Sequence, residues 1–171
     1  MTAAAAAAEP DDAGKLARLA VELLTADGRT IAVAESLTGG LVTGALTSIA
    51  GASVVVRGGV VAYATELKAE LLGVPAELLA RQGPVDPEVA VAMAAGVRRL
   101  LGASYGLATT GVAGPGPADG KPQGTVFVAI AGRSGPACDG LALAGDRQQV
   151  RDQTVRSALS ILVRTLREDA S

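Results

Sequence analysis

The chain has 171 residues, with 15 Lys and Arg against 17 Asp and Glu, one cysteine and no histidine. This length favours a single domain that buries about 70% of the surface exposed by its unfolded chain. The lack of histidine excludes Ser–His and Cys–His catalysis within the chain and removes the usual zinc ligands. The base of a hydrolase would therefore be Lys, Asp, Glu or Tyr.

Charge and hydropathy patterning exclude further classes of partner. With a formal net charge of −2 and 2% aromatic residues, the chain lacks the basic, base-stacking surface of a nucleic-acid-binding protein. The apolar runs are too short to span a bilayer, so we expect no membrane contact. Residues 1–12 lack the basic and apolar regions of a signal peptide and are expected to be a disordered tail, which favours a cytoplasmic protein. Cys138 is expected to be a small core residue rather than a reactive thiol.

The first elements in chain order alternate between helix and strand. Apolar residues at helical spacing predict a helix over 15–28, which is followed by a short buried strand over 30–34. A second helix is expected over 39–49 and a β-branched strand over 54–65. The pair Gly58–Gly59 inside that strand predicts a bulge or a close backbone approach.

The middle of the chain has clearer helix signals. Thr65 as N-cap and Gly73 as a stop predict a short helix. Asp86 as N-cap and Pro87 at the first helical position begin the best-marked helix. A buried strand is expected over 104–111, and Gly and Pro dominate the loop over 112–124.

The last elements decide the fold class. Strands are expected over 125–131 and 138–144, and a final helix begins near Asp146. Helices bracketing about five strands predict an α/β protein, a three-layer α/β/α sandwich with a mixed, mostly parallel central sheet. Residues 13–171 are expected to form this single domain.

The stretch "AESLTGG" follows the first predicted strand and begins the second helix. Ligands of open α/β sheets bind beyond the carboxyl ends of the strands. Glycines at a helix start allow close backbone approach, and free N–H groups there can hold an anion. The same pattern also fits a plain helix cap with tightly packed glycines. The candidate residues of this stretch are Glu35, Ser36, Thr38, Gly39 and Gly40.

Lys68 is a candidate general base. The chain has three lysines among its 15 basic residues, and a helix capped by Thr65 would place Lys68 in its first turn. The positive end of the helix dipole, together with burial, would lower the pKa of this amine. A neutral amine can accept the proton of a serine hydroxyl. The alternative is a solvated lysine paired with Glu66 or Glu70.

Three further stretches carry polar groups near the same edge of the predicted sheet. Tyr63 lies five residues before Lys68, where it would orient the amine, stack on a ring or serve as a strand aromatic. Thr109 and Thr110 precede a glycine loop that begins at Gly111. Arg147 falls in the first turn of the last helix, where a cation needs an anionic partner, so it is a candidate phosphate or carboxylate clamp. It would otherwise pair with Asp146 or a neighbouring loop.

Taken in order, these motifs resemble the CinA carboxy-terminal domain family. The resemblance covers residues 13–167 and rests on "AESLTGGLVTGALTSIAGAS", "GGVVAYATELKAELLGVP", "QGPVDPEVAVAMAAG", "TTGVAGPG", "KPQGTVFVAI" and "GDRQQVR". Stand-alone members of that family are nicotinamide-nucleotide amidases of the PncC type. The resemblance therefore implies that a pyridine nucleotide, nicotinamide mononucleotide, is deamidated to nicotinic acid mononucleotide and ammonia by water, without a metal or a cofactor.

The resemblance also assigns roles to residues. It implies a Ser–Lys pair, Ser36 and Lys68, supported by Tyr63, Thr110 and Arg147. Lys68 would take the proton of Ser36, and backbone N–H groups near 38–40 or Gly111 would stabilise the oxyanion. Arg147 with a glycine-rich turn would hold the phosphate.

The chain departs from the family pattern at several positions. Leu37 stands where a cysteine is common, "ATELK" replaces a run like "SNEAK", and the loop over 114–122 is compact. Three alternatives stay open: a nucleotide-binding module without turnover, an interaction protein related to competence or DNA damage, and a hydrolase of another carboxamide nucleotide. The alanine-rich apolar faces favour a homo-oligomer.

Overall fold

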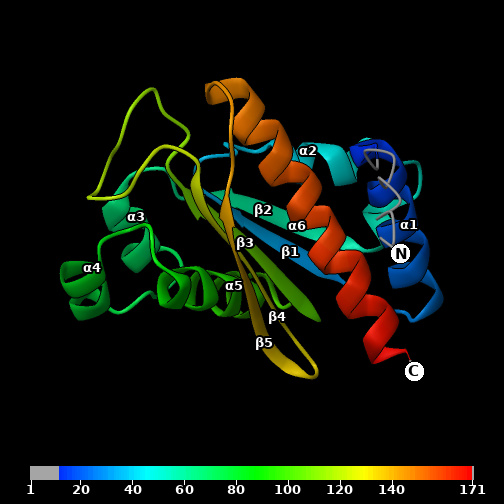
Figure 1. The fold of residues 1–171 in the computed structure, drawn as a ribbon. Helices are drawn as coiled ribbons and strands as arrows, with labels where there is room; N and C mark the ends of the chain where they lie inside the picture. The colour runs from blue at the N-terminus through cyan, green and yellow to red at the C-terminus, as the bar shows by residue number, and fades with distance from the viewer. Residues whose placement is uncertain (1–11, 171) are drawn as a thin grey trace, which may run out of the picture.

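The computed structural model describes residues 12–170, which form one mixed sheet with helices on both faces (Figure 1). The predicted tail lies outside the described residues except for Asp12. The helices are α1 (Ala13–Ala26), α2 (Leu41–Thr47), α3 (Thr65–Glu70), α4 (Ala76–Gln82), α5 (Pro87–Leu101) and α6 (Arg147–Asp169), with a 3₁₀ turn η1 (Ala52–Val54). The strands are β1 (Ile31–Glu35), β2 (Val56–Val61), β3 (Tyr105–Gly111), β4 (Thr125–Gly132) and β5 (Gly135–Ala142).

The sheet has the strand order β2-β1-β3-β4-β5. Strand β1 pairs in parallel with both β2 and β3, and the β3–β4 and β4–β5 pairs are antiparallel. Within this sheet only β4 therefore runs against the others, which confirms the mixed sheet expected from the sequence. The β1–β2 register slips by one residue at Arg57, so the predicted bulge lies beside the Gly58–Gly59 pair.

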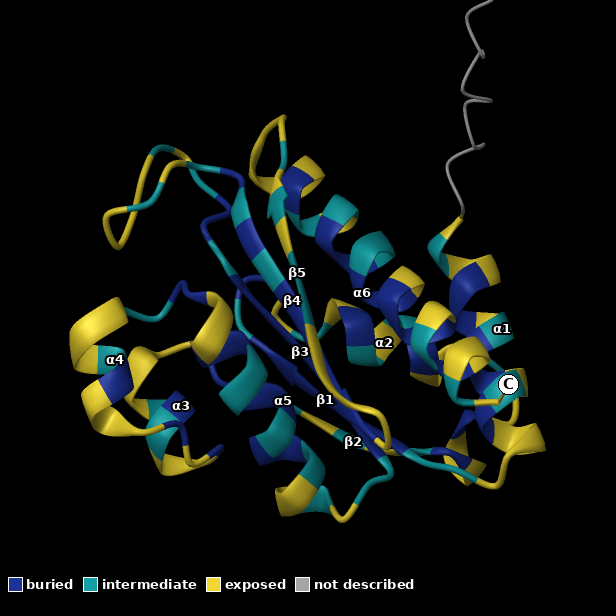
Figure 2. Cartoon of the chain, turned by 60° about the horizontal axis from the view of Figure 1, so that its bottom comes forward, coloured by how far each residue is buried: buried dark blue, intermediate teal, exposed yellow. Residues whose placement is uncertain are grey.

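Side chains of different size cover the two faces of the sheet. In β1, Ile31 and Val33 point toward the cluster formed with α1, α2 and α6, whereas Ala32 and Ala34 point toward the cluster formed with α5 and the α3–α4 region. The small residues let α5 lie close to the sheet: a Cβ built on Gly106 of β3 would be 2.0 Å from the Ala94 carbonyl oxygen. Figure 2 shows the resulting sandwich, with the mostly buried strands β1, β3 and β4 between two helical layers.

Short-range signals define the starts of three helices. The side chains of Asp12, Asp86 and Asp146 each accept a hydrogen bond from a backbone N–H of the first turn of α1, α5 and α6. Asp86 with Pro87 confirms the predicted start of α5. In α6 the bond is reciprocal, because Gln149 also accepts from the Asp146 N–H.

Several expected features were wrong. Helix α4 was not predicted, and α3 is capped by Ala64 without a side-chain hydrogen bond, so Thr65 is its first residue rather than its N-cap. The strand expected over 54–65 is shorter, because residues 52–54 form the 3₁₀ turn. Cys138 is half-buried beside the core rather than inside it.

The three parallel strands end at the same edge of the sheet. Glu35, the last residue of β1, pairs with Val61 of β2 and with Thr109 of β3. The residues that follow β1, β2 and β3 therefore meet there, and α6 begins at the same edge because β5 returns to it (Figure 1). Within residues 12–170, no helix is long and apolar enough to cross a membrane.

Candidate active site

A serine and a lysine are in contact at this edge of the sheet. Ser36 follows β1 directly, and Lys68 lies in α3, the helix that follows β2. The Lys68 Nζ donates to the Ser36 Oγ at 2.9 Å and to the Ala62 carbonyl oxygen at 2.8 Å. The two hydrogen bonds fix the amine beside the hydroxyl. This is the geometry that a nucleophile and its base require.

Burial changes the protonation of Lys68. Its side chain is 1% exposed and makes no ion pair in the described part of the chain. Loss of hydration lowers its pKa from 10.5 to about 8, against a smaller effect of the Asp119 carboxylate, which raises it. The predicted direction is confirmed, but the cause is burial, and the alternative of a solvated lysine paired with Glu66 or Glu70 is wrong.

Tyr63 and Arg147 form the rim above this pair. Arg147, the first residue of α6, donates from Nη1 to the Gly114 carbonyl oxygen at 2.7 Å and from Nη2 to the Tyr63 hydroxyl at 3.0 Å. The guanidinium therefore joins the end of β2 to the loop between β3 and β4. The Tyr63 ring is 60% exposed, and its hydroxyl contacts Arg147 rather than Lys68.

The end of β3 and the following loop form another wall. The buried Thr110 hydroxyl donates to the Pro84 carbonyl oxygen at 2.6 Å. The loop over 112–124 begins after Gly111 and contains a cis Gly114–Pro115 peptide bond. Gln123 braces the loop, because its side chain accepts from the Gly116 N–H and donates to the Gly145 carbonyl oxygen.

These elements enclose a cavity of about 250 Å³, the size of a small ligand. Ser36, Lys68, Tyr63, Thr110, Gly111 and Arg147 all line it. The charged residues of its lining are Lys68, Arg147 and Asp119, so positive groups outnumber negative ones when the amine is protonated. A small anionic molecule with an electrophilic centre suits this lining.

The model of the family described as "CinA C-terminal domain" matches residues 13–166. The chain belongs to the CinA family.

Relatives and solved structures agree with this membership. A CinA-like protein of Frankia casuarinae is 54% identical over 144 residues, which are 84% of this chain and 33% of that protein. The competence/damage inducible protein CihA of Agrobacterium tumefaciens has 38% identity and a TM-score of 0.87 over 94% of this chain and 99% of its own. A CinA superfamily protein of Klebsiella pneumoniae has 33% identity and a TM-score of 0.88 over 92% and 99%. The chain spans about a third of the length of the curated relatives it matches.

Glu35 does not line the cavity of this CinA-family domain, contrary to the substrate-binding role expected from the sequence. Its buried carboxylate accepts from the N–H groups of Gly40, Val42 and Thr43 at 2.8–3.1 Å, and from the Thr43 hydroxyl. The anion at the start of α2 is thus a side chain of the protein itself. The Leu41 N–H donates to the Thr38 carbonyl oxygen, so no N–H group of residues 40–43 is left for a substrate.

Gly39, Gly40 and Thr38 also lie outside the cavity lining. The two glycines have φ values of 58° and 103°, a backbone conformation that favours glycine and turns the chain into α2. The Thr38 hydroxyl shares a buried hydrogen bond of 2.8 Å with that of Thr109. The two glycines thus shape the turn after Ser36, and the Thr38 side chain supports that turn rather than facing a ligand.

Sequence reasoning missed two polar residues near the cavity. Asp119 has φ 51° and is followed by Gly120 with φ 70°, between the bridged residues Ala118 and Lys121. The dipeptide Asp-Gly is the signal that predicts such a tight turn. Arg151 lies 114 positions from Leu37, to which it donates, so no local pattern predicts that contact.

The described residues hold no cluster of three or more His, Cys, Asp or Glu side chains that could bind a metal ion. The polar groups of the cavity are instead an amine, hydroxyl groups, a guanidinium and one carboxylate. Such a set supports proton transfer and the binding of an anion.

Proposed function

We propose that this CinA-family chain is an amidase that hydrolyses the carboxamide of nicotinamide mononucleotide to the carboxylate and ammonia. The observation that carries the proposal is the 2.9 Å hydrogen bond between Lys68 Nζ and Ser36 Oγ at the base of a 250 Å³ cavity. The choice of this nucleotide among amides rests on the resemblance to the PncC type. The cationic lining fits its phosphate.

In the first step Ser36 is the nucleophile and Lys68 is the base. With its pKa near 8, Lys68 is partly neutral at physiological pH. The neutral amine donates to the Ala62 carbonyl oxygen and directs its lone pair to the Ser36 hydroxyl. As the Oγ–C bond forms, the hydroxyl proton moves to Nζ and the carboxamide oxygen becomes an oxyanion.

The same amine serves the later steps. Protonated Lys68 gives its proton to the leaving nitrogen, the C–N bond breaks and ammonia departs. Water then attacks the acyl–Ser36 ester and gives a proton to Lys68. Collapse of the second tetrahedral intermediate releases the acid, and the proton returns to Oγ, so the enzyme is restored.

Backbone N–H groups of the turn after Ser36 are suited to the oxyanion. The Gly39 N–H donates to the Ser36 carbonyl oxygen, and the Gly40 N–H donates to the Glu35 carboxylate. Neither is therefore free to stabilise the oxyanion, contrary to the expectation from the sequence. The N–H groups of Leu37 and Thr38 donate to no acceptor within residues 12–170. Since buried backbone donors are rarely left unpaired, we assign these two to the oxyanion.

Arg147 is assigned to the phosphate. Its guanidinium is exposed at the rim and bonds to neutral partners, the Gly114 carbonyl and the Tyr63 hydroxyl. A phosphate oxygen would give it the charged partner that it lacks there. Tyr63, in contact with the same group, would move with it and close one side of the cavity.

The test is ammonia release from nicotinamide mononucleotide by the purified chain. Ser36→Ala and Lys68→Ala should each reduce kcat by about 10³-fold or more, because each removes a member of the reacting pair. Ser48→Ala in the segment after α2 and Lys15→Ala in α1 are matched controls that should retain the activity. Wild-type protein that binds the nucleotide without releasing ammonia would contradict the proposal.

Substrate comparison tests the assignment of Arg147. Nicotinamide riboside lacks the phosphate, so wild-type protein should hydrolyse it with a higher KM than the nucleotide. Arg147→Ala should raise KM for the nucleotide and leave that for the riboside almost unchanged. Equal effects on both substrates would remove Arg147 from the phosphate site.

A further inference from the structure

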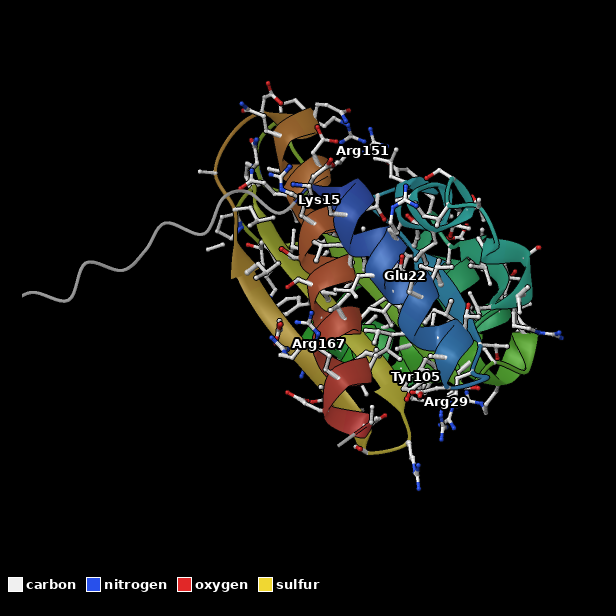
Figure 3. All side chains as sticks on the ribbon, turned by 90° about the vertical axis from the view of Figure 1, so that its right-hand side faces the viewer. Lys15, Glu22, Arg29, Tyr105, Arg151 and Arg167 are labelled. Atoms are coloured by element: carbon white, nitrogen blue, oxygen red, sulfur yellow. The ribbon has the colours of Figure 1, made fainter. Side chains whose placement is uncertain are left out.

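The turn between β1 and α2 is held from outside by a residue of α6, Arg151. Its Nε donates to the Leu37 carbonyl oxygen at 3.0 Å and its Nη2 to the Thr38 carbonyl oxygen at 3.3 Å. Its Nη1 donates to the Gln148 side chain at 3.1 Å. Figure 3 labels Arg151 near the N-terminal end of α6. All three nitrogens of the guanidinium are therefore engaged.

The guanidinium lies next to the glycine of the turn. A Cβ built on Gly39 would lie 3.5 Å from the Arg151 Nη2, so the guanidinium lies against the backbone of the turn. Arg151 is one helical turn after Arg147, and residues four apart lie on the same face of a helix. One face of α6 thus carries both Arg147, at the rim of the cavity, and Arg151, which contacts the turn after Ser36.

The two carbonyl contacts determine where the backbone N–H groups point. A trans peptide is planar, with its C=O and N–H on opposite sides. Fixing the Leu37 carbonyl on Arg151 therefore fixes the direction of the Thr38 N–H. The Ser36 carbonyl and the Leu37 N–H belong to one peptide unit. The bond from the Gly39 N–H to the Ser36 carbonyl oxygen therefore fixes the direction of the Leu37 N–H. Neither of these two N–H groups has an acceptor among residues 12–170.

We propose that Arg151 is a positioning residue: it orients the Leu37–Thr38 peptide so that the N–H groups after Ser36 are preorganised for the oxyanion. The inference rests on the proposed acyl transfer at Ser36. Lysine cannot reproduce the contact, because an ammonium lacks the planar fork that reaches two successive carbonyls at once. Arg151 does not line the cavity, so it acts through the turn and not on the substrate.

The experiment compares Arg151→Ala and Arg151→Lys with wild type. Misplaced oxyanion donors weaken transition-state binding more than substrate binding, so kcat should fall about tenfold to a hundredfold with KM unchanged. The acid limb of the pH–rate profile should keep its midpoint, since Lys68 is untouched. Guanidinium ion at a non-denaturing concentration should restore part of the kcat of Arg151→Ala. Arg156→Ala, on the same helix, is the matched control.

A Ser36 labelling rate separates this inference from the proposed substrate. A fluorophosphonate probe also forms an oxyanion-like centre when it reacts with Ser36, so its rate should fall in both Arg151 variants even if nicotinamide mononucleotide is not the substrate. Unchanged kcat and labelling in either folded variant would overturn the inference. So would a raised KM with unchanged kcat, since Arg151 would then act in binding. If Arg151→Ala fails to fold, the kcat and the labelling rate of Arg151→Lys decide the inference by the same criteria.

Discussion

At the scale of single residues, the charge of Lys68 depends on two opposing influences. Burial lowers its pKa, the Asp119 carboxylate of the loop between β3 and β4 raises it by less, and the result is a pKa of about 8. The effect of Asp119 is smaller than that of burial, but a single substitution can remove it. Asp119 therefore adjusts the pH at which Lys68 becomes a base.

Asp119→Asn should move the acid limb of the kcat/KM profile to lower pH. In wild type the limb should have its midpoint near pH 8, where Lys68 loses its proton in the free enzyme. Without the neighbouring negative charge the protonated amine is less stable, so the pKa of Lys68 falls further. Ammonia release between pH 5 and 10 measures the shift. Asp152→Asn is the control, and a limb that stays in place or moves to higher pH would contradict the prediction.

The depressed pKa of Lys68 also makes stability depend on pH. Below pH 8 both the folded and the unfolded chain hold the proton, and the folded state carries the full cost of a buried charge. Between about 8 and 10.5 the folded amine loses its proton first, so the unfolded state binds more protons and stability rises with pH.

The free energy of unfolding of wild type relative to Lys68→Met should therefore increase from pH 7.5 toward pH 10.5. Urea unfolding at several pH values measures the difference, in which the titration of all other groups cancels. A difference that is constant over this range would show that the amine is not desolvated as the fold implies.

At the scale of elements, glycines set how closely helices approach their neighbours. Gly96 of α5 faces the segment after α3, where a Cβ would lie 1.9 Å from the Leu72 carbonyl oxygen. A Cβ built on Gly44 of α2, by contrast, would have no neighbouring atom within 4 Å. The two residues have the same local role in a helix and different surroundings.

Gly44→Ala should stabilise the protein by about 0.5–1 kcal/mol, because alanine loses less backbone entropy in a helix than glycine. Gly96→Ala gains the same helix propensity but should destabilise the protein by about 1–3 kcal/mol, because the backbone of Leu72 must move. Thermal or urea unfolding of the two variants measures both effects. Equal stabilisation by both would refute the close approach of α5.

Local signals explain which elements the sequence could predict. Asp86 and Pro87 determine the start of α5 through contacts within two residues, so that start was predicted correctly. Helix α4 follows Pro75 without a side-chain cap and buries only Leu78 among its own residues, so neither a cap nor an apolar period revealed it. The resemblance to the CinA family implied the pairing of Ser36 with Lys68, whereas the order of elements implied only that the segments after the parallel strands share one edge of the sheet.

The contacts that sequence could not predict are the long-range ones. The role of Glu35 depends on how two glycines with positive φ turn the chain back on itself, which residue types alone do not specify. The contact of Arg151 with the Ser36 turn joins residues 114 positions apart. Such pairings arise only once α6 packs across the sheet.

At the scale of the whole molecule, one buried tyrosine connects the sheet to the end of the chain. The Tyr105 hydroxyl, at the start of β3, donates to Asp169 Oδ2 at 2.7 Å, and the Ser134 hydroxyl of the β4–β5 turn donates to the other oxygen. Figure 3 places Tyr105 beside the C-terminal end of α6. These hydrogen bonds lower the pKa of Asp169, and burial raises that of Tyr105 to about 12.

Tyr105→Phe should lower the free energy of unfolding by about 1–3 kcal/mol at pH 7, since a partly buried hydrogen bond to a carboxylate is lost. The stabilisation of ionised Asp169 is present above its unfolded pKa of 3.8 and is lost as pH falls through the lower folded value. The difference from wild type should therefore shrink below pH 4. Urea unfolding tests this, with Tyr63→Phe on the exposed rim as the control.

The carboxylate of Glu35, satisfied entirely by the chain, has a consequence for how specificity can diverge. Because the protein supplies its own counter-ion for the start of α2, the nucleophile's surroundings are organised before any ligand arrives. Changes in the loop over 112–124 or at Arg147 can then alter which molecule is accepted without rebuilding the reactive centre. Substrate recognition, by the loop over 112–124 and Arg147, can therefore diverge while the segment around Ser36 stays the same.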